Sequence, residues 1–583
     1  MNIQECDILN ELAEEPFTNQ RLLSKNTRHS LGIINRSLKG LMNEGYLDET
    51  CGLTEKAREL LDESTARRAV ILAAGFGMRM VPINTETPKG LLEVHGEPLI
   101  ERTIKQLHEA GIYEIYIVVG FMKEQYEYLI DQYDVRLIVN AEYSVKNNLH
   151  SVKLVEKYLE NAYIVPCDIW CRRNPFRKHE LYSWYMVSDQ LKPNNSVRVN
   201  RKMELVSVPD SEDGNEAIGI CYLTGKDGPA VAKRIEKLAE DPRYDNVFWE
   251  EALYGKDRMT VPARVVPAGD AVEINTYEQL RELDSNSNQL KSDAIETAAS
   301  ALQCSIDEIV NITILKKGMT NRSFLFDCRD KKYIMRIPGE GTDRLIDRKR
   351  EAQVYDVIKS RRICDDIVYI NPENGYKITE FLNRARVCDP LDMEDVEKCM
   401  GKLREFHGMG LRVDHRFDLF GQMEFYESLW EGKSSAYKDY KDTKDKVLSL
   451  KEYIDGQEKT ETLTHIDAVP DNFLFAADQN GEEEIRLIDW EYAGMQDPHV
   501  DLAMFSIYSF YSREQIDRLI DIYFRGNCPE EVRTKIYCYV SVCGLLWSNW
   551  CEYKRNLGVD FGEYSLRQCR YAKEFYKIAS SRM

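Results

Sequence analysis

The sequence predicts a multidomain protein with three parts: a small helical α(+β) domain over residues 1–64, an α/β domain over 67–285 and a two-lobed α+β domain over 300–583. Three observations predict this. Apolar residues recur every three or four positions in the first part, strand-like and helix-like runs alternate in the second, and short strands give way to helices in the third. A length of 583 residues agrees with three or four domains of roughly 100–200 residues.

The composition excludes several classes of protein. The chain has 78 basic and 98 acidic residues, a net charge of −20, so as a whole it lacks the basic field of a protein that coats nucleic acid or anionic membrane. Hydrophobic residues at 43% and charged residues at 30% are ordinary for a globular protein. The first residues are acidic and do not form a secretory signal. Fifteen scattered cysteines show no disulfide framework, so we expect a cytoplasmic protein with reduced thiols.

The longest uncharged run covers residues 536–551. It is shorter than the roughly 20 apolar residues of a membrane-spanning helix and contains Ser, Asn and two Trp. We therefore predict a buried helix in a soluble protein without a membrane partner.

The first domain shows helical periodicity. We predict helices over residues 7–12, 19–25 and 28–44, a small hairpin over 46–54, and a last helix capped by Thr54 over 55–61. This order of elements resembles the winged helix-turn-helix family, which implies DNA as a partner. The third helix carries few basic residues, however, whereas DNA binding requires a cluster of phosphate contacts. Packing or oligomerisation therefore remains an alternative role.

The second domain is predicted to be a parallel sheet covered by helices. Strands are predicted over residues 68–75, 114–120, 134–140 and 161–168, with a helix over 100–110. Ligands of such sheets bind at the carboxyl ends of the strands. After this domain, the segment 284–300 begins polar and shows no apolar stripe, so we predict a linker near residues 285–291.

A glycine-rich turn follows the first predicted strand. Its small residues allow backbone N–H groups to approach a nucleotide; they are Ala73, Ala74, Gly75 and Gly77. Arg79 could stabilise the charge of a phosphoryl transition state, and Lys89, in Thr-Pro-Lys, is a point charge suited to phosphate. The pattern resembles the nucleotidyltransferases that join a nucleoside triphosphate to a phosphorylated small molecule, which implies a Rossmann-like fold.

Downstream residues narrow this resemblance. The runs Asn147–Ser151 and Val165–Asp168 are similar to bacterial phosphocholine cytidylyltransferases. The resemblance implies CTP and phosphocholine as substrates and Mg²⁺ bound by Asp168, a hard cation that prefers oxygen ligands. Glu273 matches a second acidic ligand, whereas Asn275 is neutral where close relatives carry Asp. A trimethylammonium group needs aromatic faces and a carboxylate; the candidates are Tyr222, Trp249 and Glu250.

The third domain contains the spacing of a kinase catalytic loop. Asp467 and Asn472 lie in HIDAVPDN, and Asp489 ends the next predicted strand. Asp467 would orient the acceptor hydroxyl and take its proton, while Asn472 and Asp489 would hold Mg²⁺ against the ATP phosphates.

Upstream residues supply the other parts of a phosphoryl-transfer site. The candidates are Thr320 and Asn321 in a phosphate-covering turn, Arg336 where protein kinases have lysine, and Glu351 as its helix partner. Together the motifs resemble the choline kinase and aminoglycoside phosphotransferase superfamily, in which an aspartate matching Asp501 braces the catalytic loop.

An aromatic pair points to the acceptor. A quaternary ammonium cannot donate hydrogen bonds, so aromatic faces must recognise it. Trp547 and Trp550 lie three apart on one face of a predicted helix, as in a Trp pair of the choline kinases, and Tyr508 and Tyr511 could add walls.

The two chemistries form one sequence of reactions, because the product of the kinase is the acceptor of the transferase. We therefore expect a bifunctional enzyme that makes phosphocholine from choline and ATP, then CDP-choline from phosphocholine and CTP. One alternative keeps both folds and changes the substrate to ethanolamine or a sugar. Another is a ligand-sensing transcription regulator. The oligomeric state stays open.

Overall fold

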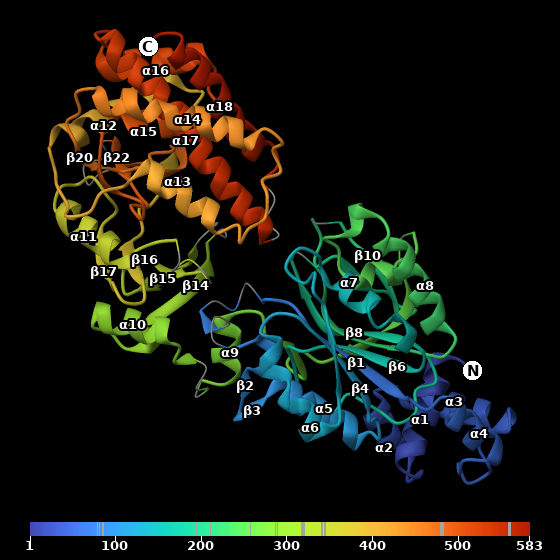
Figure 1. The fold of residues 1–583 in the computed structure, drawn as a ribbon. Coiled ribbons are helices and arrows are strands. Elements are labelled where there is room, and N and C mark those ends of the chain that lie inside the picture. The colour runs from blue at the N-terminus through green and yellow to red at the C-terminus, as the bar shows by residue number, and fades with distance from the viewer. Residues whose placement is uncertain are drawn as a thin grey trace. The chain divides into compact units, whose positions relative to one another are not determined.

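The structure is a computed structural model of the whole chain. It describes residues 1–583 except 78–79, 81, 84–86, 194, 210, 257, 286, 288–289, 316–320, 340–341, 343–344, 478–482 and 558–560. The chain divides into two compact units, Met1–Ile295 and Glu296–Met583 (Figure 1).

Four helices begin the first unit: α1 (Ile3–Glu14), α2 (Gln20–Thr27), α3 (Leu31–Asn43) and α4 (Glu55–Glu63). Each starts at a polar side chain that accepts a backbone N–H of the first turn, and the predicted Thr54 cap is confirmed. Gly45 leaves α3 with φ of +76°. A bridge between Leu47 and Leu53 closes the predicted hairpin.

A nine-stranded sheet follows, with the order β5-β4-β1-β6-β11-β8-β12-β10-β9. The four predicted strands are confirmed and parallel: β1 (Arg68–Ala73), β4 (Glu114–Val119), β5 (Arg136–Val139) and β6 (Ala162–Pro166). The other five are β8 (Trp184–Lys192), β9 (Val197–Val199), β10 (Glu204–Ser207), β11 (Gly214–Leu223) and β12 (Arg258–Val266). The prediction of a wholly parallel sheet is wrong. Strand β11 runs antiparallel to both β6 and β8, and β10 runs antiparallel to β9 and β12, whereas β8 and β12 pair in parallel. No helix occurs between β8 and β11 in the described residues, so the chain has no crossover to make them parallel.

Helices cover both faces of the sheet (Figure 1). Ala69, Ile71 and Ala73 of β1 pack with α5 (Leu99–Glu109) and α6 (Tyr128–Tyr133), whereas Val70 packs with α7 (Asn148–Lys153) and α8 (Asp227–Ala239). Both faces of β1 are therefore buried, and ligands of such sheets bind at the carboxyl ends of the strands.

Short elements connect the strands and helices of this unit. They are the 3₁₀ helices η3 (Lys89–Leu91), η4 (Lys123–Tyr126), η5 (Glu156–Tyr158), η6 (Pro242–Tyr244) and η7 (Trp249–Leu253), the ribbons β2 (Glu93–Val94) with β3 (Glu97–Pro98) and β7 (Ile169–Cys171) with β13 (Ala271–Glu273), and α9 (Tyr277–Leu283).

Two described residues of the predicted linker, Ser287 and Leu290, are packed against the rest of the chain. The Ser287 hydroxyl donates to the Glu93 carbonyl over 3.0 Å and Leu290 is buried. Helix α10 (Asp293–Leu302) then buries Ala294, Ile295 and Ala298. The prediction that residues 284–300 lack an apolar stripe is wrong, because small alanines make up most of that stripe.

The second unit has two lobes, as predicted. The smaller lobe is a five-stranded antiparallel sheet with helix α11 (Arg348–Ile358); its strands are β14 (Ile309–Ile314), β15 (Asn321–Cys328), β16 (Lys331–Pro338), β17 (Ile367–Ile370) and β18 (Lys377–Glu380), preceded by η9 (Ile306–Glu308). In Figure 1 the helices of the larger lobe gather at the end of this unit away from the five-stranded sheet.

The larger lobe is mostly helical. Its helices are α12 (Met393–Gly408), α13 (Leu419–Ser428), α14 (Tyr440–Gly456), α15 (His499–Tyr508), α16 (Arg513–Phe524), α17 (Glu530–Asn556) and α18 (Glu563–Ser580). Its short strands are β19 (Arg386–Val387), β20 (Thr462–Thr464), β21 (Phe473–Ala477), β22 (Glu483–Leu487) and β23 (Gly494–Gln496), with η11 (Pro470–Asn472).

The uncharged run 536–551 forms the middle of α17. All its residues are buried by the surrounding helices, which confirms the predicted buried helix. Among the residues that the structure describes, no helix is both long and apolar enough to cross a membrane.

Candidate active sites

The first candidate site lies at the carboxyl end of β1. Ala73 ends the strand, and the carbonyl of Ala74 accepts the backbone N–H of Phe121 over 3.1 Å, so the glycine turn is fixed to the neighbouring strand. Gly77 has φ of +65°, and a Cβ there would lie 3.3 Å from Cδ of Lys89. A glycine therefore suits both the conformation and the close approach at this position.

Lys89 joins two of the predicted metal ligands. Its Nζ donates to Oδ1 of Asn275 over 2.8 Å and forms an ion pair with Oδ2 of Asp168. Asp168 follows β6, and the pairing of β7 with β13 brings the Glu273–Asn275 segment beside it, with the Ile274 N–H donating to the Asp168 carbonyl over 3.0 Å. The structure thus brings together three of the predicted residues from distant parts of the sequence.

Oxygen donors in this cluster suit a hard divalent cation. Oδ1 of Asp168 is buried and has no hydrogen-bond partner among the described residues. Asp168 and Asn275 already share one cation, the ammonium of Lys89. The donor set therefore fits Mg²⁺.

Three predicted phosphocholine contacts have different surroundings. Glu250 is half-buried, and its Oε1 accepts the Tyr185 hydroxyl over 3.2 Å. Burial raises the pKa of Glu250 to about 7, and the nearby Glu273 carboxylate adds to the effect. Tyr222 and Trp249, in contrast, are fully buried in the two hydrophobic clusters of the sheet.

The predictions for Tyr222 and Trp249 are wrong, because neither ring has an exposed face for a ligand. Tyr222 pairs with Tyr163 near the start of β6, whereas Asp168 follows the other end of that strand.

The second candidate site is built on the loop after β20. The N–H groups of His465 and Ile466 donate to the carboxylate of Asp501 over 3.1 and 2.7 Å. This bracing role for Asp501 was expected. It holds Ile466 at φ of +70°, a conformation that is costly for a β-branched residue.

The loop brings the predicted catalytic residues together. The side-chain amide of Asn472 donates to the Asp467 carbonyl over 2.9 Å and to its Oδ2 over 3.3 Å. The Ile488 N–H donates to the Asn472 carbonyl over 2.9 Å, which fixes Asp489 beside the loop. Burial raises the pKa of Asp467 to about 8, with the carboxylates of Asp489 and Glu491 adding to the effect.

The predicted pair of Arg336 and Glu351 is present. Nη2 of Arg336 donates to Oε2 of Glu351 over 2.9 Å and to the Gly375 carbonyl over 3.2 Å. Burial alone would raise the pKa of Glu351, but the Arg336 guanidinium outweighs it and lowers that pKa to about 2. The pair is therefore ionised across the ordinary pH range.

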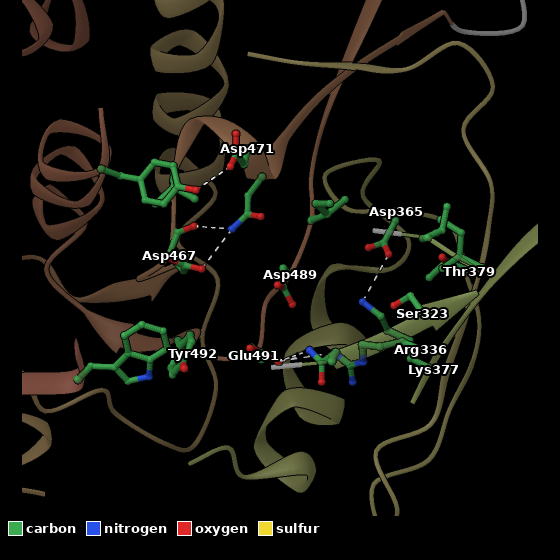
Figure 2. A pocket seen from close by; sticks show the side chains of 18 of the residues that line it. Ser323, Arg336, Asp365, Lys377, Thr379, Asp467, Asp471, Asp489, Glu491 and Tyr492 are labelled. Carbon is green, nitrogen blue, oxygen red and sulfur yellow. Dashed lines mark hydrogen bonds and ion pairs between the residues drawn. The ribbon is translucent and has the colours of Figure 1, made fainter. Parts of the chain in front are cut away.

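The catalytic loop, Asp489 and Arg336 line one cavity of about 510 Å³. In Figure 2, Asp467 and Asp471 lie on one side, Ser323, Arg336 and Lys377 on the other, and Asp489 between them. The predicted residues that line it are Asn321, Arg336, Asp467, Asn472, Asp489, Tyr508, Trp547 and Trp550.

One end of the cavity is aromatic. The rings of Trp547 and Trp550 lie 5.6 Å apart in an edge-to-face arrangement. Tyr508 lies 6.0 Å from Tyr564 and donates its hydroxyl to Asp471 over 2.6 Å. Such rings beside carboxylates suit a cation without hydrogen-bond donors.

Tyr511 is not part of the cavity wall, and this prediction is wrong. It is buried and does not line the cavity, and its hydroxyl donates to the Pro390 carbonyl. Arg79 and Thr320, also predicted, lie outside the described residues.

Sequence reasoning missed several residues at this site. Tyr564 and Tyr492 line the aromatic end, and Glu491 and Lys377 line the opposite part. Burial and the neighbouring Asp489 carboxylate raise the pKa of Glu491 to about 7. Only Glu491 had a usable signal, because it lies two residues after a predicted metal ligand.

Comparison with known proteins covers both units. Residues 69–177 match the MobA-like NTP transferase domain, and residues 312–522 match the choline/ethanolamine kinase family. Choline-phosphate cytidylyltransferase of Streptococcus pneumoniae is 31% identical over 222 residues, which cover 37% of this chain and 96% of that protein.

Relatives of the second unit are more distant. Protein LicA of Haemophilus influenzae is 26% identical over 265 residues, which cover 43% of this chain and 76% of that protein. The crystal structure of choline kinase LicA from Streptococcus pneumoniae shares 27% identity over 49% of this chain and 98% of that chain, with a TM-score of 0.43. The chain belongs to the family of bacterial choline-phosphate cytidylyltransferases and carries, after that domain, a segment that matches the choline/ethanolamine kinases.

Proposed function

We propose that this chain makes CDP-choline from choline in two steps, phosphorylation by ATP followed by cytidylyl transfer from CTP. The observation that carries the proposal is that a choline/ethanolamine kinase segment and a choline-phosphate cytidylyltransferase segment occur in one chain. The first reaction produces the acceptor of the second. A covalent link between the two sites raises the local concentration of each site around the other.

In the kinase step, Asp467 accepts the proton of the choline hydroxyl as the hydroxyl oxygen attacks the γ-phosphorus of ATP, and ADP leaves. Asn472 and Asp489 would hold Mg²⁺, since both line the cavity and both side chains carry oxygen ligands of the kind that Mg²⁺ prefers. When bound, the metal neutralises charge on the phosphate oxygens. Arg336, oriented by Glu351, binds the donor phosphates, and Asn321 lines the same part of the cavity.

In the transferase step, a phosphocholine oxygen attacks the α-phosphorus of CTP and pyrophosphate leaves. Asp168, Glu273 and Asn275 would hold Mg²⁺, which supplies positive charge at the reacting phosphates. Lys89 provides a second positive charge, Arg79 is proposed as a third, and the backbone of residues 73–77 approaches the nucleotide. No covalent protein intermediate is required, so positioning and charge neutralisation are sufficient. Glu250 is the proposed partner of the trimethylammonium group.

Choline is favoured over ethanolamine by the aromatic end of the kinase cavity. Trp547, Trp550, Tyr508 and Tyr564 present rings there, whereas a primary ammonium would be recognised better by hydrogen-bond acceptors. Ethanolamine is the second candidate, because the matching family includes kinases for it.

Residues 1–64 form, we infer, a winged helix-turn-helix domain. The order α1–α2–α3, the Leu47–Leu53 bridge and α4 support this. Asn35, Arg36 and Lys39 of α3 are exposed, as DNA contacts would require.

Packing is the alternative role of this domain. The Tyr182 hydroxyl donates to Asp7 over 2.7 Å, and Arg177 pairs with Glu11 over 3.0 Å, so α1 is bound to the transferase domain. A gel-shift assay with genomic fragments at two salt concentrations tests DNA binding, because phosphate contacts weaken as salt rises.

The cytoplasmic location is part of the same proposal, supported by fifteen cysteines that are all unbridged. The test of function is an assay of the purified chain with Mg²⁺, ATP, CTP and either choline or ethanolamine. We expect CDP-choline and more rapid turnover of choline; CDP-ethanolamine as the main product would favour the second candidate.

A further inference from the structure

Four ionisable side chains form a buried network at the wall of the kinase cavity, which two of them, Arg336 and Glu491, line. They are two arginines and two glutamates, all at most 6% exposed: Arg336, Arg348, Glu351 and Glu491. Arg336 and Glu351 are the expected kinase pair. Arg348 belongs to no motif recognised in the sequence, and it does not line the cavity.

Arg348 contacts a neighbour on its own helix and three other segments of the chain. Its Nη1 donates to Oε2 of Glu351 over 3.1 Å and to Oε2 of Glu491 over 3.5 Å. Its Nη2 donates to Oδ1 of Asn321 over 3.4 Å and to Oγ1 of Thr342 over 3.2 Å. One guanidinium thus joins helix α11, the segment after Asp489, the start of β15 and the segment after β16.

Both polar atoms of the Asn321 side-chain amide form hydrogen bonds within this network. Its Nδ2 donates to Oε2 of Glu491 over 3.0 Å, while its Oδ1 accepts from Arg348. Asn321 lines the cavity at the first residue of β15. Arg348 and Glu491 therefore fix the orientation of a side chain that faces the phosphate donor.

The planar shape of the guanidinium is essential to this arrangement. It presents donors in a rigid fork, whereas a lysine ammonium is a single point charge on a flexible stem. Packing restrains the plane further, because a Cβ on Gly375 would lie 2.8 Å from Nε of Arg348.

We propose that Arg348 is a positioning residue of the phosphoryl-transfer site, which holds Asn321 and Glu491 in the arrangement that binds ATP. The inference rests on the proposed kinase function. Arg348 acts through its neighbours, so its replacement weakens donor binding and leaves acceptor binding intact.

The test compares Arg348→Lys and Arg348→Met with the full-length wild-type chain. We measure KM for ATP, KM for choline and kcat, and separately the Kd of ATP by calorimetry, which requires no acceptor. In Arg348→Lys we expect the Kd and KM for ATP to rise about tenfold, as after loss of a charge-assisted hydrogen bond, with KM for choline unchanged. Arg348→Met should have the larger effect.

Two further variants separate positioning from general structure. Arg350→Met removes an exposed arginine of the same helix that pairs with Asp347, and we expect no change. Asn321→Ala should raise KM for ATP, and adding Arg348→Lys to it should change little more, because the two residues act together.

An unchanged Kd for ATP in Arg348→Lys would overturn the proposal, and so would independent, multiplicative effects of the Asn321 and Arg348 variants. Failure of the wild type to phosphorylate choline or ethanolamine would instead contradict the proposed function. The Kd of ATP would still decide the role of Arg348 in that case.

Discussion

The backbone N–H of Ile466 donates to Oδ1 of Asp501 over 2.7 Å, although the two residues are 35 positions apart. The other carboxylate oxygen accepts the His465 N–H and contacts Nε2 of His407 over 3.0 Å. Asp501 thus stabilises a strained backbone conformation immediately before Asp467, and the position of the proposed base depends on it.

Replacing Asp501 tests this dependence. In Asp501→Asn the amide oxygen can accept only some of these hydrogen bonds. The new NH₂ group would face N–H donors, with which it cannot form a hydrogen bond. We expect the kcat of choline phosphorylation to fall by at least about tenfold. Cytidylyl transfer from supplied phosphocholine is the internal control and should stay unchanged; equal loss of both steps would contradict the assignment.

The aromatic end of the cavity predicts a change in acceptor specificity. Trp550→Leu removes a ring face but keeps an apolar side chain, so KM for choline should rise about tenfold, as expected for a desolvated cation–π contact. KM for ethanolamine should rise less. Tyr511→Phe is the matched control, because Tyr511 is buried away from the cavity. If Tyr511→Phe alters KM for choline and Trp550→Leu does not, the aromatic pocket is wrongly placed.

The raised pKa of Glu250 predicts that the stability difference between Glu250→Gln and wild type depends on pH. Burial raises its pKa from 4.5 to about 7 in the native state. Its protonated form therefore stabilises the fold most fully below pH 4.5, and this contribution is lost as the pH rises through 7. The glutamine of Glu250→Gln does not titrate, so this variant does not lose stability from position 250 as the pH rises.

The free energy of unfolding of Glu250→Gln minus that of wild type should therefore increase with pH, by about 2 kcal/mol between pH 5.5 and 8.5 for these two pKa values. Chemical denaturation at pH 5.5 and 8.5 measures it, and other titrating groups cancel in the difference. A difference that is independent of pH would show that Glu250 titrates normally.

The segment carrying Lys89 predicts sensitivity to one added methyl group. A Cβ on Gly90 would lie 3.1 Å from Cβ of Cys167 and from the hydroxyl oxygen of Tyr126. Gly90→Ala should therefore displace Lys89 and lower the kcat of cytidylyl transfer while choline phosphorylation persists. Gly401→Ala, in α12, has nothing within 4 Å of its Cβ and serves as the control. Normal transfer by Gly90→Ala would mean that this contact does not position Lys89.

Much of both sites could be predicted because the chemistry depends on local spacing. Asp467 and Asn472 lie on one loop, where a hydrogen bond joins them directly. Trp547 and Trp550 share a helix face because three residues make almost one turn. Strand ends likewise bring Asp168 near the glycine turn, as expected for a parallel sheet.

The remaining features depend on packing that no local pattern encodes. Tyr508 and Tyr511 are only three residues apart, but α15 ends at Tyr508 and Phe510 has φ of +56°, so the chain turns and Tyr511 leaves the cavity. The contact between Asn321 and Glu491 spans 170 positions. Tyr222 and Trp249 were candidates by residue type, and burial removes them.

The most direct test of the two-step account follows both nucleotide products in two variants of the full chain. Asp467→Ala should make no CDP-choline from choline but normal amounts from supplied phosphocholine, whereas Lys89→Ala should accumulate phosphocholine when given choline, ATP and CTP. Loss of the same step in both variants would contradict the account.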